Sequence, residues 1–364
     1  MNTSKSGVNL SKYQYTYDAA GNQLTKTDNT GTTNYTYDNL NRLSRVTEPA
    51  GRITSYIYDN AGNRRSEKVQ VGQIITNTMY TYNEQNRLVS TLTSNGDVVR
   101  YVYDKNGNLV SKTTGKSALI TGQVNGNTGT ETNELLGFGV IISRDSENGT
   151  GSDNLTLYTY NKFNQLIKAK TKDTTSNYLY NADGYRIEKK TNGITTRYLY
   201  ESDKVVLETN ENNTQKAFQV YGTNLLYRSV KATSGMSAQS YYYLYNAHGD
   251  VTGLIDANGT IAATYDYDAF GNMLYQTGNA NNNIKYVGYQ YDTETGLYYL
   301  NARYYDSVTA RFITEDSYRG KANDPLSLNL YTYCANNPIM YIDPSGHTLE
   351  RGDKGEDENN YSMN

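Results

Sequence analysis

Side chains suited to metal, thiol or imidazole chemistry are scarce in this chain. Cysteine occurs once, at Cys334, and histidine occurs only at His248 and His347. A structural zinc site needs four such ligands and a disulfide needs two cysteines, so neither is expected within the chain. His248 precedes Gly249 in a predicted turn, where a solvated imidazole is the ordinary interpretation. We therefore expect no metal ion and no other cofactor.

Two short motifs suggest functions that their surroundings do not support. Gly115-Lys116-Ser117 ends like a phosphate-binding loop, but Val110 occupies the position of the first glycine and no helical pattern follows. The adhesion tripeptide Arg351-Gly352-Asp353 lies in a short charged tail, where chance occurrence is the ordinary explanation.

Composition points to a folded protein with an aromatic core. The 364 residues include 39 tyrosines, against five phenylalanines and no tryptophan, and the net charge is −3. Tyrosine rings can supply the buried apolar surface while their hydroxyls are satisfied at its rim. The balanced charge argues against a nucleic-acid surface, which needs a basic stripe.

Membrane and export signals are also missing from the sequence. The longest mostly apolar run, residues 135–142, is too short to span a bilayer. The first twelve residues lack the apolar stretch of a signal peptide. The chain is then either cytosolic or part of a longer exported protein, secreted or held at the cell surface.

Pairs of tyrosines separated by one residue recur along the chain, mostly every 20 to 24 residues. Residues two apart in a strand point to the same face, so each pair lays two rings side by side. The pairs stand at Tyr15/Tyr17, Tyr35/Tyr37, Tyr56/Tyr58, Tyr80/Tyr82, Tyr101/Tyr103, Tyr158/Tyr160, Tyr178/Tyr180, Tyr198/Tyr200, Tyr243/Tyr245 and Tyr265/Tyr267.

A regular turn follows nearly every pair. The residue after the second tyrosine is usually Asp or Asn, which can open a turn by bonding the backbone. Four residues after that tyrosine stands a glycine or asparagine, which tolerates positive φ. These residues are Gly21, Asn41, Gly62, Asn86, Gly107, Asn164, Gly184, Gly249 and Gly271, and only the pair Tyr198/Tyr200 lacks the pattern. Each unit therefore predicts one β-hairpin.

Single hairpins are marginal in water, so the units must join into one long, curved antiparallel sheet. We expect an all-β protein, with residues 1–10 disordered, repeats over 11–242, and an irregular insertion at 111–154. Residues 135–142 could add one strand to that insertion. The last 40 residues, which hold three of the four prolines, should form a different structure.

The repeats and the C-terminal third resemble a known family. YTYDAAGNQLTKT, YIYDNAGNRRSEK and YVYDKNGNLVSKT are similar to the tyrosine-aspartate (YD) repeats of bacterial Rhs proteins. YDYDAFGNML, GYQYDTETGLYYLNARYYDSVTARFITEDS and NLYTYCANNPIMYIDPSGH resemble the Rhs repeat-associated core domain over residues 243–347. The resemblance implies a hollow β-shell, or cocoon, with the core rolled inward as a plug. Ten hairpins are too few to close a cocoon like those of large members, so we expect an open, partial shell.

The resemblance also implies self-cleavage by an aspartyl-protease-like site. By motif the site residues fall on Arg303, Asp316 and Asp343, with cleavage between His347 and Thr348. Two carboxylates held close share a proton, one acting as base and the other as acid. Self-cleaving members carry leucine where this chain has His347. By spacing alone, both aspartates are better explained as turn formers than as catalysts, and Arg311 and Phe312 as structural anchors.

The implied function is a shell that encapsulates and presents a C-terminal toxin domain. After His347 only 17 residues remain, so we expect the toxin to be missing here, the tail 348–364 to be disordered, and further shell to lie upstream. The expected partners are that toxin domain and that upstream shell, without nucleic acid or a membrane span. The alternative is a cell-surface adhesion module whose exposed tyrosines bind carbohydrate.

Overall fold

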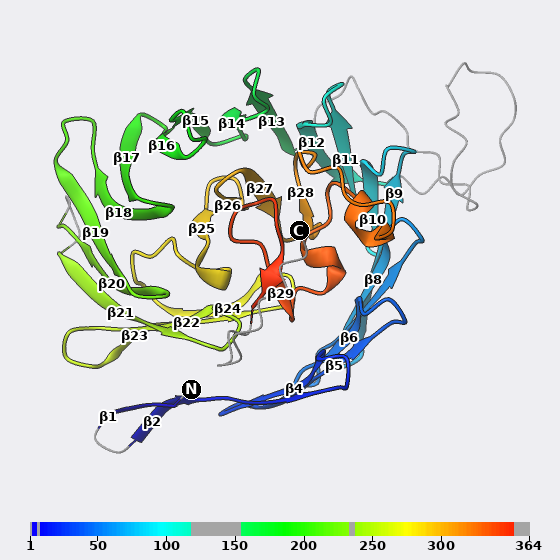
Figure 1. The fold of residues 1–364 in the computed structure, drawn as a ribbon, viewed down its shortest axis with the longest axis horizontal. Coiled ribbons are helices and arrows are strands. Elements are labelled where there is room, and N and C mark those ends of the chain that lie inside the picture. Colours follow the sequence, from blue (N-terminus) through cyan, green and yellow to red (C-terminus); the bar gives the residue numbers. More distant parts are fainter. Residues whose placement is uncertain (1, 6–7, 118–153, 233–236, 353–364) are drawn as a thin grey trace, which may run out of the picture.

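The computed structural model describes residues 2–5, 8–117, 154–232 and 237–352. Twenty-two antiparallel strands, β3 to β24, form one sheet that curves into a ring, and the C-terminal segments lie inside it (Figure 1). The described residues contain no α-helix, and their only helical turns are η1 (Tyr286–Gly288), η2 (Pro325–Leu328) and η3 (Cys334–Asn336). The predicted all-β fold, a long curved sheet with a core plug, is confirmed.

The ring strands pair in chain order. The first ten are β3 (Gln14–Tyr17), β4 (Gln23–Asp28), β5 (Gly31–Tyr37), β6 (Leu43–Thr47), β7 (Ile53–Tyr58), β8 (Arg64–Val71), β9 (Ile74–Tyr82), β10 (Leu88–Thr93), β11 (Asp97–Tyr103) and β12 (Leu109–Lys116). The other twelve are β13 (Asn154–Tyr160), β14 (Leu166–Lys170), β15 (Thr175–Tyr180), β16 (Arg186–Thr191), β17 (Ile194–Glu201), β18 (Lys204–Thr209), β19 (Gln215–Tyr221), β20 (Leu225–Val230), β21 (Gln239–Tyr245), β22 (Val251–Ile255), β23 (Ile261–Tyr267) and β24 (Met273–Gly278).

The hairpin between β7 and β8 shows why the repeat folds as it does. Asp59 N donates to Asn63 O at 2.9 Å, and Gly62 N donates to Asp59 O at 3.2 Å. The Asp59 carboxylate accepts from Asn63 N at 2.8 Å, so this side chain organises the turn. Gly62 adopts φ +80°, and all nine glycines and asparagines predicted for this position have positive φ. The predicted hairpins are therefore confirmed.

The two tyrosines of a pair have different roles: the first packs in the core and the second forms a hydrogen bond to the preceding hairpin. Tyr56 is buried, Ile57 between the pair is 61% exposed, and Tyr58 donates its hydroxyl to Leu43 O in the preceding hairpin at 2.9 Å. Phenylalanine could not make that bond, which staples each hairpin to the one before it. The same bond joins Tyr37 to Gln23, Tyr82 to Arg64, Tyr160 to Leu109, Tyr180 to Leu166, Tyr200 to Arg186, Tyr245 to Leu225 and Tyr267 to Val251.

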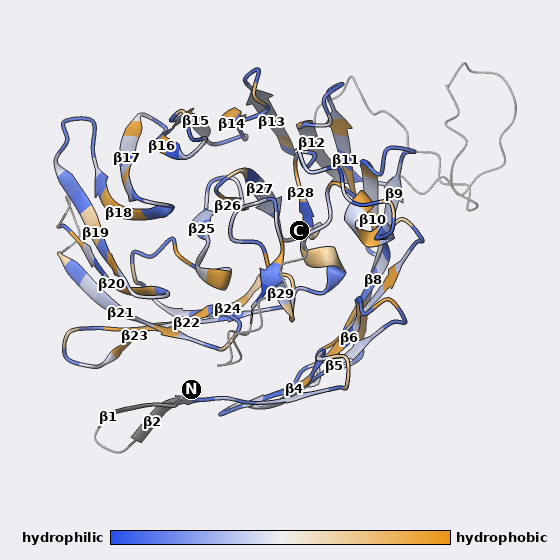
Figure 2. Cartoon of the chain, viewed as in Figure 1, coloured by the Kyte–Doolittle hydropathy of each residue, from blue (hydrophilic) through white to orange (hydrophobic). Residues whose placement is uncertain are grey.

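Buried and exposed residues alternate along the strands of the ring, although several apolar side chains such as Ile57 lie on the exposed face. In β5 the burial alternates, with Thr33 and Tyr35 buried and their neighbours Thr32 and Asn34 exposed. Hydrophobic and hydrophilic residues are accordingly interspersed along the strands of the ring (Figure 2). This is the period-two pattern of a sheet with one face in water.

The sheet closes on itself, because β24 lies next to β3. The expectation of an open sheet was therefore wrong. Closure depends on curvature and filling rather than on strand number alone, and here the core fills a ring of a single turn. The junction of β24 with β3 is much sparser than the pairing of consecutive strands within the ring. Beside it, Ala247 N donates to Tyr15 Oη at 3.0 Å across the gap.

Inside the ring, the core forms a small antiparallel sheet. Its strands are β25 (Gln290–Asp292), β26 (Leu297–Leu300), β27 (Arg303–Asp306) and β28 (Arg311–Phe312). Every residue of β26, β27 and β28 is buried. Their tyrosines pack with those of the ring, as Tyr304 does with Tyr178 at a ring separation of 5.7 Å.

The core docks on the turns and bulges of the hairpins. A register shift after each turn leaves a backbone N–H that points out of the ladder. Core groups accept these bonds at Leu109 N to Ile313 O, Arg186 N to Tyr299 Oη and Val251 N to Lys285 O. Core amides donate to turn carbonyls, from Asn329 to Ala61, from Asn336 to Gly62 and from Asn337 to Asn41.

Several expected boundaries differ from the structure. Residues expected to be disordered at the N-terminus form β1 (Asn2–Lys5) and β2 (Val8–Lys12), a separate pair of strands. The strand β12 extends to Lys116, into the expected insertion, whose residues 118–153, including 135–142, lie outside the described residues. In the expected tail, β30 (Glu350–Arg351) pairs with β29 (Tyr341–Ile342), and 353–364 lie outside. Residues 243–278, expected within the core, complete the ring as β21–β24.

Candidate functional site

The candidate site is built around one buried arginine at the start of β27. The Arg303 guanidinium lies 3.6 Å from the Phe312 ring centroid, in cation–π contact, and is 5% exposed. Its Nη1 donates to Leu330 O at 3.1 Å and its Nε donates to Gly346 O. These bonds fix the orientation of the guanidinium group, which lies between the core sheet and the chain that follows Asp343.

Arg303 joins the two aspartates that the motif singled out. Its Nη2 lies 2.7 Å from Asp316 Oδ2 and 3.5 Å from Asp343 Oδ2. Both carboxylates are buried, at 8% and 3% exposure. The structure therefore brings together the three residues predicted from the motif. One guanidinium nitrogen of Arg303 bridges the two carboxylates.

A tight turn holds Asp343 against the chain that follows it. Its Oδ1 accepts from Gly346 N at 2.8 Å and from His347 N at 3.0 Å. Gly346 has φ +79°, and a Cβ there would collide with the carbonyl oxygen of Leu300. Asp343 N donates to Tyr289 Oη at 2.9 Å, which fixes the start of the turn from the other side.

The two aspartates differ in their electrostatic surroundings. Burial raises the pKa of Asp343 to about 6, although the Arg303 charge opposes the shift. Asp316 has the shorter contact with Arg303, and its Oδ1 also accepts from Tyr318 N at 2.9 Å. The raised pKa can keep Asp343 partly protonated, as a general acid requires.

Both aspartates also hold the residue before the expected scissile bond. His347 Nδ1 lies 2.9 Å from Asp316 Oδ1, while its backbone N–H donates to Asp343. Thr348 N donates to Ser345 Oγ at 3.3 Å. The peptide bond between His347 and Thr348 is thus held beside the carboxylates.

Two hollows reach the site from different sides. One, of about 640 Å³, is lined by Arg303, Asp316 and His347. The other, of about 520 Å³, is lined by the same three residues together with Asp343 and Thr348. Either is wide enough to admit water to the carboxylates.

Sequence reasoning missed the groups that position this site. Tyr289 and Phe312 have no spacing that connects them with Arg303, because the core fold brings the three together from separate strands. Phe312 was expected only as an anchor. Arg311 has the contacts of an anchor, since its guanidinium donates to Asn63 Oδ1 at 3.1 Å and to the Asn86 carbonyl.

The other singled-out residues have structural contacts. The solvated imidazole predicted for His248 is wrong: its side chain is 12% exposed and its Nδ1 lies 3.0 Å from Asp250 Oδ1. Burial would lower the pKa of His248, but the Asp250 charge raises it above the usual value. Lys116 is part of β12 and pairs with Asp97. Arg351 donates to Gly21 O at 3.3 Å, and Asp353 lies outside the described residues.

No helix among the described residues has the length and apolar character needed to cross a membrane. The sequence model of the family described as Teneurin YD-shell matches residues 54–339. A second family model, RHS Repeat, matches residues 17–53 and 37–69.

Known proteins resemble parts of the chain. The tRNA(Glu)-specific nuclease WapA of Bacillus subtilis subsp. natto is 47% identical over 112 residues, 30% of this chain and 5% of that protein. Salivary gland surface protein 1 of Aedes aegypti is 35% identical over 109 residues, 29% of this chain and 3% of that protein. The crystal structure of TcdB2-TccC3-Cdc42 is 19% identical and covers 95% of this chain and 20% of that chain, with a TM-score of 0.43.

This chain therefore spans a small part of the length of these relatives. The Teneurin YD-shell match covers well over half of the chain, in the region that forms the ring and the core. The chain belongs to the teneurin YD-shell family, with repeats of the Rhs type.

Proposed function

We propose that this chain is the shell and core of an Rhs-type toxin and that it cuts itself after His347. The observation that carries the proposal is that Asp316 contacts the His347 imidazole and Asp343 accepts a hydrogen bond from the His347 backbone N–H. Arg303 lies between the two carboxylates. In this function the ring encloses the chain that begins at Thr348. Cleavage after His347 then frees that chain. Such a protein acts outside the cell, as part of a longer exported chain.

The proposed reaction is hydrolysis of the peptide bond between His347 and Thr348. Asp316, ionised, takes a proton from water as the water oxygen bonds to the carbonyl carbon of His347. Asp343, protonated, gives its proton to the departing nitrogen of Thr348 as the C–N bond breaks. The products are a carboxylate at His347 and an amine at Thr348. Arg303 stabilises the negative charge that develops between the carboxylates.

The pKa of Asp343 supports this assignment of acid and base. At about 6, it leaves a useful share of the carboxyl protonated in mildly acidic solution. Asp316 has the shorter contact with Arg303, at 2.7 Å, and is assigned the role of base.

Intact mass of the purified chain tests the proposal. The wild type should lose residues 348–364, the tail of 17 residues, and Asp343→Asn should retain it. Asp256→Asn, at an aspartate that organises a ring turn, is the matched control and should cut itself like the wild type. A wild type that keeps its full mass at pH 5 to 7 would overturn the self-processing proposal.

Carbohydrate binding by the tyrosine pairs is not proposed, because the first tyrosine of most pairs is buried. Tyr35, Tyr56, Tyr178 and Tyr198, for example, are between 1% and 7% exposed. Rings in these positions cannot stack on a sugar without opening the sheet.

A further inference from the structure

The inner wall of the ring repeats one position in each hairpin, and leucine is the residue found there most often. The residue two positions after the turn glycine or asparagine sits at the bulge and points into the ring, and it is most often a fully buried leucine. The hydroxyl of a tyrosine in a following hairpin bonds its carbonyl. Leucine stands here at Leu43, Leu88, Leu109 and Leu166, Leu225 accepts the same bond in its own hairpin, and the other repeats carry Gln23, Arg64, Arg186, Val251 and Met273.

A repeating apolar wall poses a problem for the core. Hydrophobic contact has no direction, so a core packed against equivalent leucines can slip by one repeat at small cost. Its polar contacts with turn carbonyls do not prevent slippage, because each turn offers carbonyls in the same place. The core can occupy one position in the ring only if some wall residue differs from the residues at the same position in the other repeats.

Arg186 is such a residue. It stands at the leucine position of its repeat, its carbonyl accepts the same bond from Tyr200, and its side chain is 0% exposed. Its guanidinium contacts Asp292 of β25, with Nη1 to Oδ2 at 2.5 Å and Nη2 to Oδ1 at 3.2 Å. It also donates to Gln290 Oε1 at 2.7 Å and Tyr304 Oη at 3.0 Å.

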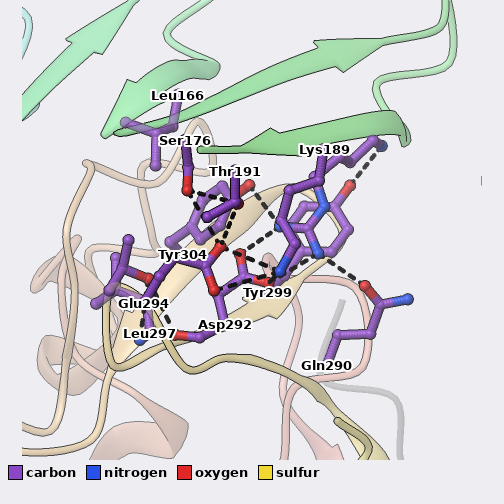
Figure 3. Close-up of polar contacts among 12 residues, drawn as sticks. Leu166, Ser176, Lys189, Thr191, Gln290, Asp292, Glu294, Leu297, Tyr299 and Tyr304 are labelled. Carbon is purple, nitrogen blue, oxygen red and sulfur yellow. Dashed lines mark hydrogen bonds and ion pairs between the residues drawn. The ribbon is translucent and has the colours of Figure 1, made fainter. Parts of the chain in front are cut away.

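The carboxylate that neutralises Arg186 belongs to the core and is itself 0% exposed. Figure 3 shows Asp292, Glu294, Tyr299 and Tyr304 of the core gathered beneath Lys189 of the wall. Lys189 Nζ lies 2.8 Å from Asp292 Oδ1 and 3.1 Å from Glu294 Oε1. The cluster therefore joins β16 of the ring to β25 of the core by charge.

One other repeat carries arginine at the same position, and it provides the contrast. Arg64 is 3% exposed, but its anion is Glu67, three residues further along the same ring strand, at 2.7 Å. Its guanidinium stacks on Tyr56 and Phe270 of the ring at 4.6 and 4.1 Å. Of these two arginines, Arg186 takes its carboxylate from the core and Arg64 takes its carboxylate from the ring.

We propose that Arg186 is a positioning residue that seats the core in one rotational register inside the ring through its contact with Asp292. A buried ion pair of this kind contributes specificity more readily than stability, since an apolar pair of similar volume packs as well. Opposite the repeats that carry leucine or valine here, Asp292 would stay buried without a partner, and opposite Arg64 it would compete with Glu67, so slipped registers are penalised.

The register also determines where the proposed cleavage site lies. Tyr304, which contacts Arg186, is the neighbour of Arg303 in β27, and β27 pairs with β26, which pairs with β25. Through this route Arg186 acts on Arg303 without touching it. This consequence rests on the proposed function, whereas the register itself does not.

A zero-length cross-link can report the register in the full chain. Lys112 of β12 and Asp306 of β27 form a second wall-to-core ion pair at 3.2 Å, on a different part of the ring from Arg186. A carbodiimide joins such a pair as an amide that mass spectrometry can locate. In Arg186→Leu/Asp292→Leu, we expect the folded chain to give about threefold less of this cross-link, as the core spreads over several registers.

Matched variants separate register from general damage. Arg64→Leu/Glu67→Gln removes an ion pair at the same repeat position and should leave the cross-link at the wild-type yield. Arg186→Lys keeps the charge without the two-pronged geometry and should restore part of the yield. If the double leucine variant does not fold, Arg186→Met/Asp292→Asn, closer in volume, replaces it with the same expectation.

A folded Arg186→Leu/Asp292→Leu chain with the wild-type yield of cross-link would overturn the proposal. So would an equal loss in the Arg64 control. Self-processing is measured in the same samples. If the wild type does not cut itself but the cross-link falls as expected, the register stands and the proposed function fails.

Discussion

Glu48 offers a test of how the ring is closed. It lines a cavity of about 380 Å³ between the first and last hairpins, together with Asp266 and Asp268. Burial, with the charges of these two aspartates, raises the pKa of Glu48 from its usual value of 4.5 to about 7, against the opposing charge of Arg52. A carboxyl whose pKa is higher in the folded state favours the fold while protonated and weakens it once ionised.

The magnitude follows from the shift. Between pH 4.5 and 7 the unfolded chain ionises Glu48 before the folded chain does, so stability falls as the pH rises through this window. The full shift would be worth about 3 kcal/mol at 1.36 kcal/mol per pKa unit, and partial exposure reduces it to about 1–2 kcal/mol. Glu48→Gln cannot ionise and should therefore be more stable than the wild type by about 1–2 kcal/mol at pH 8.

Urea unfolding of the wild type and Glu48→Gln at pH 5 and pH 8 measures this difference. At pH 5 most of the wild-type Glu48 is protonated in the fold, and the two chains should be nearly equal. The comparison with the variant cancels the contribution of every other carboxyl. The reasoning about the junction is refuted if Glu48→Gln is no more stable than the wild type at pH 8. It is equally refuted if the variant exceeds the wild type by the same amount at pH 5 and at pH 8.

Three further outcomes are expected. Tyr58→Phe should lower the free energy of unfolding by about 1 kcal/mol, because it leaves the Leu43 carbonyl of the preceding hairpin unpaired. Tyr275→Phe, at a 63% exposed side chain, should change it by less than about 0.5 kcal/mol, and equal effects of the two variants in urea unfolding would contradict a stabilising role for the Tyr58 hydroxyl bond. Gly346→Ala should abolish self-processing in an intact-mass assay, since its Cβ would strike Leu300 O; normal processing would refute the turn geometry. Self-processing should slow as the pH rises above about 6, because Asp343 then loses its proton; a rate that climbs from pH 6 to 8 would argue against Asp343 as the acid.

The local fold could be predicted because its signal is local. The Tyr-x-Tyr strand, the aspartate that opens the turn and the positive-φ residue four positions later lie within one hairpin, so spacing alone reveals them. Tyr58 illustrates the limit, since the pair pattern predicts its strand but not that its hydroxyl reaches Leu43 in another hairpin.

The parts that spacing could not predict depend on contacts between distant segments. Closure of the ring depends on the meeting of β3 and β24, and the burial of His248 on the packing of Tyr286 at 5.5 Å. Arg186 looks in sequence like any polar strand residue, because its partner Asp292 lies 106 residues away. The site residues were found through a family motif, while their meeting around Arg303 required the core fold.

The most direct test of the proposed function is the sequence of the new N-terminus after incubation of the full chain at pH 5.5. We expect a fragment that begins Thr348-Leu349-Glu350, formed at a rate independent of protein concentration and absent from Asp316→Asn and Asp343→Asn. An uncut wild type, a fragment that begins elsewhere, or the same fragment from both variants would contradict it.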